Sequence, residues 1–192
     1  MMMEPICLDF EHWQVHTFRP EELGRHDLLV REIHQLLSDR QTLYFLPEKH
    51  LRSVADAADW LKTAILNFYC GRNYVHLITE KNNHRLTGII DIIPPATSRE
   101  YYTLEHYPYF IEFYLRKEAA GQKLMSSILP MVLNALERRG IGQLAAAVNR
   151  SNHAARRALE NSGFAYQRPF DSLQDLYLAQ LSNELEGARR AG

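Results

Sequence analysis

A carboxylate stands inside an aromatic run between Tyr109 and Leu115, whose sequence is YFIEFYL. If this run forms a strand, alternation sorts its side chains into two faces, one with Ile111, Phe113 and Leu115 and the other with Phe110, Glu112 and Tyr114. Glu112 is then a half-buried carboxylate among aromatic rings, which suits a general base. Tyr114, on the same face, is a further candidate for a catalytic side chain. The alternative is that Glu112 pairs with a cation across the sheet, and the sequence leaves both interpretations open.

The segment that enters this strand carries two other ionisable candidates, Glu105 and His106. A neutral imidazole accepts a proton near pH 7, so His106 is a second candidate for the base. A surface histidine without a role is the alternative.

A charged bend with a single glycine follows the strand, in the sequence RKEAAGQK. The residues after it predict an amphipathic helix from about Gly121 to Arg139, with an apolar stripe of Leu124, Ile128, Val132 and Leu136. The first turn of a helix has N–H groups without internal partners and the positive end of the helix dipole. A strand that leads directly into such a turn predicts an anion site, and a phosphate group fits it.

The rest of the chain supplies the elements that must position these residues. Periodicity predicts a strand at 13–17, a helix or helix pair at 21–37, a loop at 38–50 and a helix at 54–68 with Ser53 as its N-cap. Two strands at 74–79 and 86–93 form a hairpin, and a polar, tyrosine-rich loop follows them. A strand at 143–148, a helix at 152–162 and strands at 164–170 and 173–181 complete the order. We therefore predict one α/β domain at 1–182, with a mixed, mostly antiparallel central sheet flanked by helices, and a polar tail at 183–192.

Composition excludes several classes of function. The 192 residues include 22 Lys or Arg and 23 Asp or Glu, so no overall positive charge is present to attract nucleic acid. No apolar run is long enough to cross a membrane, and the N-terminus lacks the pattern of a secretory signal, so a cytoplasmic location is expected. The two cysteines and nine histidines have no metal-ligand spacing, and no metal site is expected.

Two stretches then carry a resemblance to a known family. The sequence VNRSNHAARRALENSGF, Val148 to Phe164, resembles a motif of the GNAT superfamily, which transfers an acyl group from acyl-CoA to an amine. The matching positions are Asn152, Ala155, Arg157, the pair Leu159-Glu160 and the pair Gly163-Phe164. This spacing is similar to that of the ribosomal-protein alanine N-acetyltransferase branch.

The second stretch, FYLRKEAAGQKLMSSIL, is similar to the strand, loop and helix that hold the CoA pyrophosphate in that branch. Matched without gaps, the motif falls on Ala120, Gly121, Gln122, Lys123, Leu124 and Met125, and several defining positions are substituted. A second register begins at Arg116 and ends at Gly121. Fewer glycines leave less room for the backbone to approach a phosphate, and Lys123 offers a point charge in compensation.

The resemblance implies the reaction and its participants. It implies an N-acetyltransferase that uses acetyl-CoA and transfers the acetyl group directly to a primary amine, either a protein N-terminus or a small molecule. It supports Glu112 as the base and implies that a backbone N–H of the same strand polarises the carbonyl. The cofactor-binding set that it implies is Phe113, Leu115, the six residues 120–125, Asn152, Ala155 and Arg157.

Three points stay open at this stage. Leu159 occupies the position where many members carry a tyrosine that protonates the CoA thiolate, and Tyr166 is an alternative donor. Asn152 is either a helix N-cap, a CoA contact or both. The aromatic loop REYYTLEHYPYF lines an acceptor pocket, caps the sheet or forms a homodimer contact. A protein that binds CoA or acyl-CoA without turnover, as a sensor or interaction module, is the alternative to an enzyme.

Overall fold

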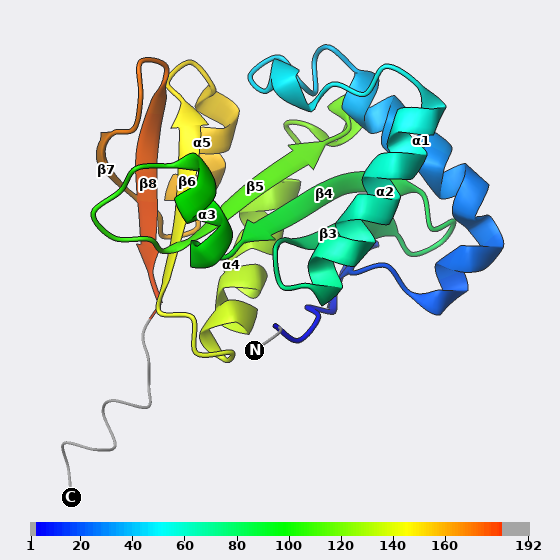
Figure 1. Cartoon of the computed structure of the whole chain (residues 1–192), viewed down its shortest axis with the longest axis horizontal. Coiled ribbons are helices and arrows are strands. Elements are labelled where there is room, and N and C mark those ends of the chain that lie inside the picture. The colour runs from blue at the N-terminus through cyan, green and yellow to red at the C-terminus, as the bar shows by residue number, and fades with distance from the viewer. Residues whose placement is uncertain (1–2, 182–192) are drawn as a thin grey trace, which may run out of the picture.

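The computed structural model describes residues 3–181, and these form one mixed α/β unit around a single sheet (Figure 1). The sheet has eight strands in the order β1-β2-β3-β4-β5-β6-β8-β7. Their bounds are β1 Leu8–Phe10, β2 Trp13–His16, β3 Tyr74–Glu80, β4 Leu86–Ile93, β5 Tyr109–Leu115, β6 Gln143–Asn149, β7 Ala165–Pro169 and β8 Gln174–Gln180. All neighbours are antiparallel except β5 and β6, which confirms the predicted mixed, mostly antiparallel sheet.

Helices cover both faces of this sheet (Figure 1). Their bounds are α1 His26–Ser38, α2 Val54–Tyr69, α3 Pro95–Tyr101, α4 Leu124–Glu137 and α5 His153–Glu160. On one face, α1 and α2 pack on Leu77, Ile89 and Tyr114. On the other, α4 buries its apolar stripe against Ile90 and Ile111. The strand residues alternate between these two clusters, so β5 has the face assignment expected from its sequence.

The centre of the sheet contains a break in its hydrogen bonding between β5 and β6. This parallel pair joins only Tyr109 to Leu144 and Phe110 to Ala145, and the two strands then diverge (Figure 1). The diverging ends lead into the loops before α4 and α5. Ligands of α/β sheets bind beyond the carboxyl ends of strands, and this divergence creates such a place.

The bend after β5 delays the start of α4 relative to the sequence prediction. We expected the helix from about Gly121, but it begins at Leu124. Gly121 has a φ of +79° and Lys123 a φ of +60°, both in the left-handed region, so the chain makes a non-helical turn before the first helical residue. A short 3₁₀ turn, Lys117–Ala119, precedes it.

Two helix starts match their predicted caps. Ser53 accepts a hydrogen bond from the amide of Asp56, whose side chain accepts in return from the amide of Ser53, and this capping box begins α2. Asn152 accepts from the amide of Ala155 at 3.1 Å and begins α5. The N-cap interpretation of Asn152 is therefore confirmed.

The sequence analysis missed two short elements. β1 is an edge strand of three residues that pairs with β2. Helix α3 begins at Pro95, where we expected only a loop, because the Pro94-Pro95 pair ends β4 and also places a proline at the first helical position.

The polar tail predicted at 183–192 lies outside the described residues. In the part of the chain that the structure describes, no helix is long and apolar enough to cross a membrane.

Candidate active site

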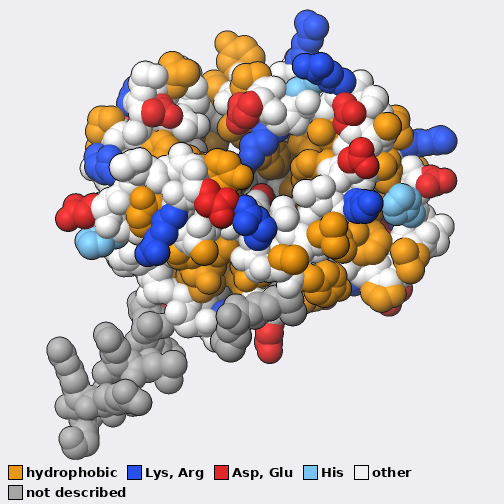
Figure 2. Space-filling model, viewed as in Figure 1, with side chains coloured by type: hydrophobic (Ala, Val, Ile, Leu, Met, Phe, Trp, Pro, Cys, Tyr) orange, Lys and Arg blue, Asp and Glu red, His pale blue; other side chains and the backbone are white. Residues whose placement is uncertain are grey.

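A cavity of about 290 Å³ lies where β5 and β6 diverge. Its walls come from β5 (Phe110, Ile111, Glu112, Phe113), from β6 and α5 (Ala146, Ala147, Val148, Asn149, Asn152, Ala155), from the α1–α2 loop (Phe45, Leu46, Glu48), and from Tyr102 and Gln174. In Figure 2 a hollow with a largely hydrophobic interior opens at the corresponding place on the surface. The cavity is therefore lined mainly by apolar side chains, together with the polar side chains of Glu48, Glu112, Asn149, Asn152 and Gln174.

The backbone of β5 presents free hydrogen-bonding groups to this cavity. The amide of Arg116 donates to Thr87 of β4, directly opposite it in the ladder, and such bonds alternate along an antiparallel pair. Even-numbered residues of β5 therefore bond to β4, and odd-numbered residues face β6. The parallel pairing of Phe110 with Ala145 engages the amide of Ile111, whereas the amide of Phe113 lies beyond the last paired residues and points into the gap. Consistently, the Leu115 carbonyl accepts from Thr42.

The same argument applies to β6 on the other side of the gap. Leu181 donates to Gly142 and Arg150 to Leu173, so even-numbered residues near β6 bond to β8. The backbone groups of Ala147 then face β5. Two open strand edges thus face each other across the cavity, and an extended ligand with amide groups of its own fits between them.

Glu112 lines the cavity and is the centre of a group of hydrogen-bonded side chains. Its Oε2 accepts from Nζ of Lys49 at 2.8 Å and from the hydroxyl of Tyr114 at 2.6 Å. Burial alone would lower the pKa of Lys49, but attraction to Glu112 and their hydrogen bond raise it above its usual value. The cation pairing that the sequence left open is therefore present, with a lysine from the α1–α2 loop instead of a neighbouring strand.

Tyr114 donates a hydrogen bond to Glu112 but does not line the cavity. Its side chain is buried against α1 and α2. Burial and the negative charge of Glu112 raise the pKa of its hydroxyl well above the usual value, so Tyr114 remains a hydrogen-bond donor. We expected Tyr114 as a catalytic side chain; in the structure it does not line the cavity, and its hydroxyl donates to Glu112.

Asp91 is a second carboxyl group that the sequence analysis missed. It lies on β4 directly opposite Glu112, and its Oδ2 accepts from Asn73 at 2.8 Å. Its Oδ1 is shielded from solvent and has no hydrogen-bond partner among residues 3–181. Burial and the nearby charge of Glu112 raise the pKa of Asp91 to about 6. A single acid in the apolar run GIIDII was the sequence feature that could have pointed to it.

The structure does not bring Glu105 and His106 to this group. Both are exposed on the loop between α3 and β5, and neither lines the cavity. The loop contributes Tyr102 instead, whose ring packs against Phe110 and Phe170. Within the segment REYYTLEHYPYF, Tyr102 and Phe110 line the cavity.

Unpaired backbone amides gather in the bend between β5 and α4. In the described chain, the amides of Gly121, Lys123, Leu124, Met125 and Ser126 donate to no backbone acceptor. Those of Ala120 and Gln122 bond within the bend. Arg116 is directed away, because its guanidinium donates to carbonyls of Leu86 and Glu32 and to the side chain of Gln35. An anion bound at this bend would therefore meet the amides of Gly121 and Lys123–Ser126 and not Arg116.

These features identify the family when the chain is compared with known proteins. Residues 21–165 match the family described as Acetyltransferase (GNAT) domain. The chain belongs to the GNAT acetyltransferases. No curated protein sequence matches the chain significantly.

Solved structures of GNAT acetyltransferases share this fold at low sequence identity. The ribosomal-protein-S5-alanine acetyltransferase from Vibrio fischeri matches with a TM-score of 0.68 at 13% identity, over 93% of this chain and 98% of that one. The ribosomal L7/L12 alpha-N-protein acetyltransferase RimL, solved with CoA, gives 0.67 at 16%, over 94% and 100%. Spermidine N-acetyltransferase from Vibrio cholerae, solved with CoA and spermine, gives 0.65 at 13%, over 91% and 98%.

Two of the other GNAT motif residues line the cavity. Asn152 and Ala155 line it, and Arg157 is exposed on α5. Leu159 is fully buried in the core below α5. Tyr166 is 52% exposed on the edge strand β7 and does not line the cavity. Neither Leu159 nor Tyr166 therefore stands where it would protonate a thiolate in this GNAT cavity. Phe113 and Leu115 pack on the α4 side of β5, and only Phe113 lines the cavity.

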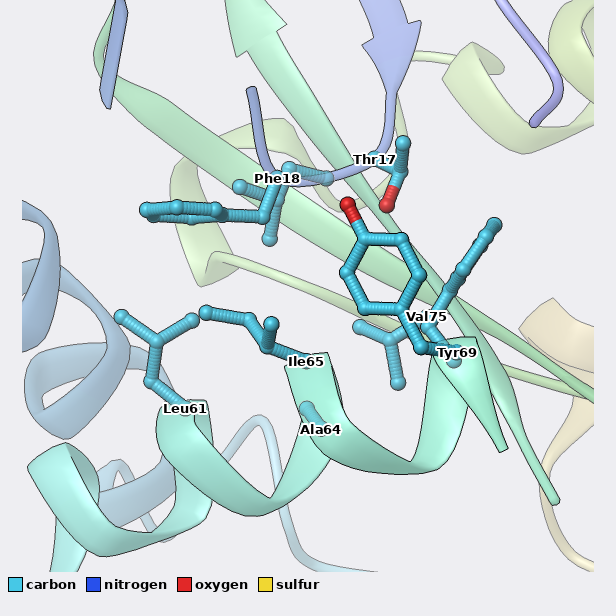
Figure 3. Close-up of a pocket in the computed structure, with 9 residues that line it drawn as sticks. Thr17, Phe18, Leu61, Ala64, Ile65, Tyr69 and Val75 are labelled. Carbon is cyan, nitrogen blue, oxygen red and sulfur yellow. The ribbon is translucent and has the colours of Figure 1, made fainter. Parts of the chain in front are cut away.

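A second, much smaller pocket lies between α2 and the segment after β2. Figure 3 shows Phe18 above Leu61 and Ile65, with Val75 and Tyr69 beside them. Its volume of about 20 Å³ holds roughly one water molecule, and its walls are apolar. It is a gap in the packing and not a second substrate site.

Among residues 3–181, no group of three His, Cys, Asp or Glu side chains is placed to hold a metal ion.

Proposed function

We propose that this GNAT acetyltransferase moves an acetyl group from acetyl-CoA directly to a primary amine at the cavity between β5 and β6. The observation that carries the proposal is the arrangement along this gap. Glu112 and the open edges of β5 and β6 line the cavity, and the unpaired amides of Gly121 and Lys123–Ser126 lie in the bend that follows β5.

The gap and the bend fit the parts of acetyl-CoA. Its pantetheine arm contains amide groups, which can bond to the free backbone groups of β5 and β6. The amides at Gly121 and Lys123–Ser126 suit the pyrophosphate, since a helix N-terminus favours anions. Lys123, beside them, adds a positive charge. We assign cofactor contact to these residues and to Phe113, Asn152 and Ala155, with Arg157 as an exposed cation on the same side.

The chemistry follows from what lies beside the reacting atoms. The amide of Phe113 points into the gap and can donate to the acetyl carbonyl, which stabilises the negative charge that develops on its oxygen. Glu112 takes a proton from the incoming ammonium ion, and Tyr114 holds the carboxylate in place. No acid is needed for the leaving group, since a thiol with a pKa near 8.5 departs readily as the thiolate.

The charges around Glu112 favour a cationic acceptor. Glu48 and Glu112 line the cavity, Asp91 lies opposite Glu112 on β4, and Lys49 forms an ion pair with Glu112. A protonated amine is attracted to such a group, whether it belongs to a protein N-terminus or to a small molecule. The related structures include enzymes named for both kinds of acceptor.

A cytoplasmic location and a homodimer stay predictions from the sequence.

A binding and a turnover measurement together test this function. We expect acetyl-CoA to raise the melting temperature, because a ligand that binds only the folded state stabilises it. We also expect thiol release when a panel of N-terminal peptides and polyamines is added. A thermal shift without thiol release for any amine would favour the non-catalytic CoA-binding alternative. The absence of any shift at saturating acetyl-CoA would contradict both.

A further inference from the structure

The amine that contacts Glu112 in this structure belongs to the protein itself. Nζ of Lys49 lies 2.8 Å from Oε2 of Glu112, the carboxylate that we assign to deprotonate an acceptor. The lysine side chain is 36% exposed and that of Glu112 is 20% exposed. An ammonium group hydrogen-bonded to this carboxylate is also what a bound acceptor would present. Lys49 thus stands in the position of a substrate amine.

The segment that carries Lys49 forms part of the cavity wall. Lys49 ends a short 3₁₀ turn, Pro47–Lys49, and its neighbours Leu46 and Glu48 line the cavity. Phe113, whose amide points into the gap, follows Glu112 directly in β5, and consecutive Cα atoms are about 3.8 Å apart. The carboxylate that holds Nζ and the amide that we assign to the acetyl carbonyl thus belong to adjacent residues, and the lysine side chain is a flexible four-carbon stem. Transfer to Lys49 requires Nζ to move from Glu112 toward a thioester bound at Phe113.

We propose that Lys49 is an acetyl acceptor of its own active site, so that the protein acetylates itself at this residue when no external amine is bound. The inference rests on the proposed function, since it uses the same thioester site and the same base. It adds a modification site at a lysine that neither the family match nor the related structures assign.

The reaction balances with acetyl-CoA as the only co-reactant. The Lys49 ammonium group first passes a proton to Glu112, and the neutral Nζ attacks the thioester carbonyl carbon. A C–N bond forms and the C–S bond breaks, with the electron pair leaving on sulfur. The second proton lost from nitrogen can neutralise the thiolate, so the products are acetyl-lysine, CoA thiol and one proton. Because base and amine belong to one chain, the step is intramolecular and gains from proximity.

Acetylation would change the charge at the site. An amide nitrogen carries no positive charge, so Glu112 would lose its ion pair with Lys49 and keep only the hydrogen bond from Tyr114. The net charge of the side chains around Glu112 would then be more negative by one. Self-acetylation therefore alters the same group of residues that we expect to attract a cationic acceptor.

The experiment incubates the full-length protein with acetyl-CoA and no amine, then maps acetylated lysines by peptide mass spectrometry. We expect Lys49 to gain one acetyl group at a rate independent of protein concentration. Lys62, exposed on α2 and remote from the cavity lining, reports non-enzymatic acetylation in the same sample. In Glu112→Gln, the rate at Lys49 should fall roughly 10²-fold and the rate at Lys62 should not change.

Two further samples separate the outcomes. When wild type is mixed with isotope-labelled Glu112→Gln, Lys49 of the labelled variant should react no faster than in the variant alone; a faster reaction would show transfer between molecules and overturn the intramolecular step. A protein whose melting temperature rises with acetyl-CoA but whose Lys49 reacts no faster than Lys62 would overturn the inference alone. The absence of any rise in melting temperature with acetyl-CoA would contradict the proposed function, and this inference would fall with it.

Discussion

Asp91 and Glu112 face each other across the β4–β5 pair, with their Cα atoms in register. Directly opposite side chains in a sheet interact, and two carboxylates in this position repel one another. The two carboxylates differ in the hydrogen-bond partners that stabilise their charge. Glu112 accepts from Lys49 and Tyr114, whereas Asp91 has only Asn73 and an unpartnered Oδ1. Of the two, Glu112 is the carboxylate that lines the cavity.

Replacement of Glu112 by Gln tests the base. We expect the maximal rate of thiol release with a competent amine to fall by roughly 10²- to 10⁴-fold, because the amide cannot accept the proton. The melting-temperature rise with acetyl-CoA should persist. Glu105→Gln is the matched control on the exposed loop and should keep the wild-type rate. An unchanged rate in Glu112→Gln would remove Glu112 from the mechanism.

Replacement of Asp91 by Asn should stabilise the protein at neutral pH. The pKa of Asp91 is raised from 3.8 to about 6 in the folded state, so its ionised form costs stability as the pH rises through this range. We expect the variant to have a free energy of unfolding about 2 kcal/mol higher at pH 8, with little difference below pH 4. Urea denaturation at both pH values measures this. Asp59→Asn, at an exposed position on α2, is the control and should change stability by less than about 0.5 kcal/mol. Equal effects of both variants would argue against a buried, repelled Asp91.

His76 predicts a pH dependence of the opposite sign. Its ring is buried, accepts from the amide of Ile6 at 3.1 Å, and burial lowers its pKa from 6.5 to about 4. Because this folded-state pKa is depressed, the stability that neutral His76 contributes is present above pH 6.5 and is lost as the pH falls toward 4. We expect the free energy of unfolding of wild type to fall between pH 6.5 and 4.5 by about 2 kcal/mol more than that of His76→Gln. The exposed His153→Gln should follow wild type, and parallel pH curves for all three proteins would contradict the assignment.

Gly121 and Gly140 form a matched pair for testing the phosphate end. Both have positive φ values, +79° and +76°, and an added Cβ would meet no atom within 4 Å at either position. Alanine should therefore cost each about 1 kcal/mol of stability through backbone strain. Gly121 carries one of the unpaired amides in the bend before α4, whereas Gly140 follows α4 at its other end. We expect only Gly121→Ala to weaken CoA binding, by about tenfold, as measured by calorimetry. Equal affinities of the two variants would place the pyrophosphate elsewhere.

The sequence predicts the central elements well because local pattern and tertiary position agree there. β4 and β5 have the bounds expected from their apolar runs, and the α2 and α5 caps are set by Ser53 and Asn152. The helix after β5 was predicted too early because the left-handed conformation of Lys123 has no sequence pattern. Helix α3 was missed because Pro94-Pro95 was interpreted only as the end of a strand.

The candidate site was predicted only in part because its contacts are distant in sequence. Glu112 could be found from alternation within one strand. Its partner Lys49 is 63 residues away in an irregular loop, and no local pattern connects the two. Asp91 becomes relevant only through the register of β4 against β5. The sequence resemblance identified the bend, while the direction taken by Arg116 required the contacts with α1.

The short ladder between β5 and β6 has a mechanical consequence. Strands β1 to β5 and strands β6 to β8 meet directly only at Tyr109–Leu144 and Phe110–Ala145, so the sheet is closed at one end and open at the other. A molecule seated in the opening would act as a missing strand and fasten the two halves together. Amide hydrogens of Phe113 and Ala147 should then exchange with solvent rapidly in the free protein and slowly once the opening is filled.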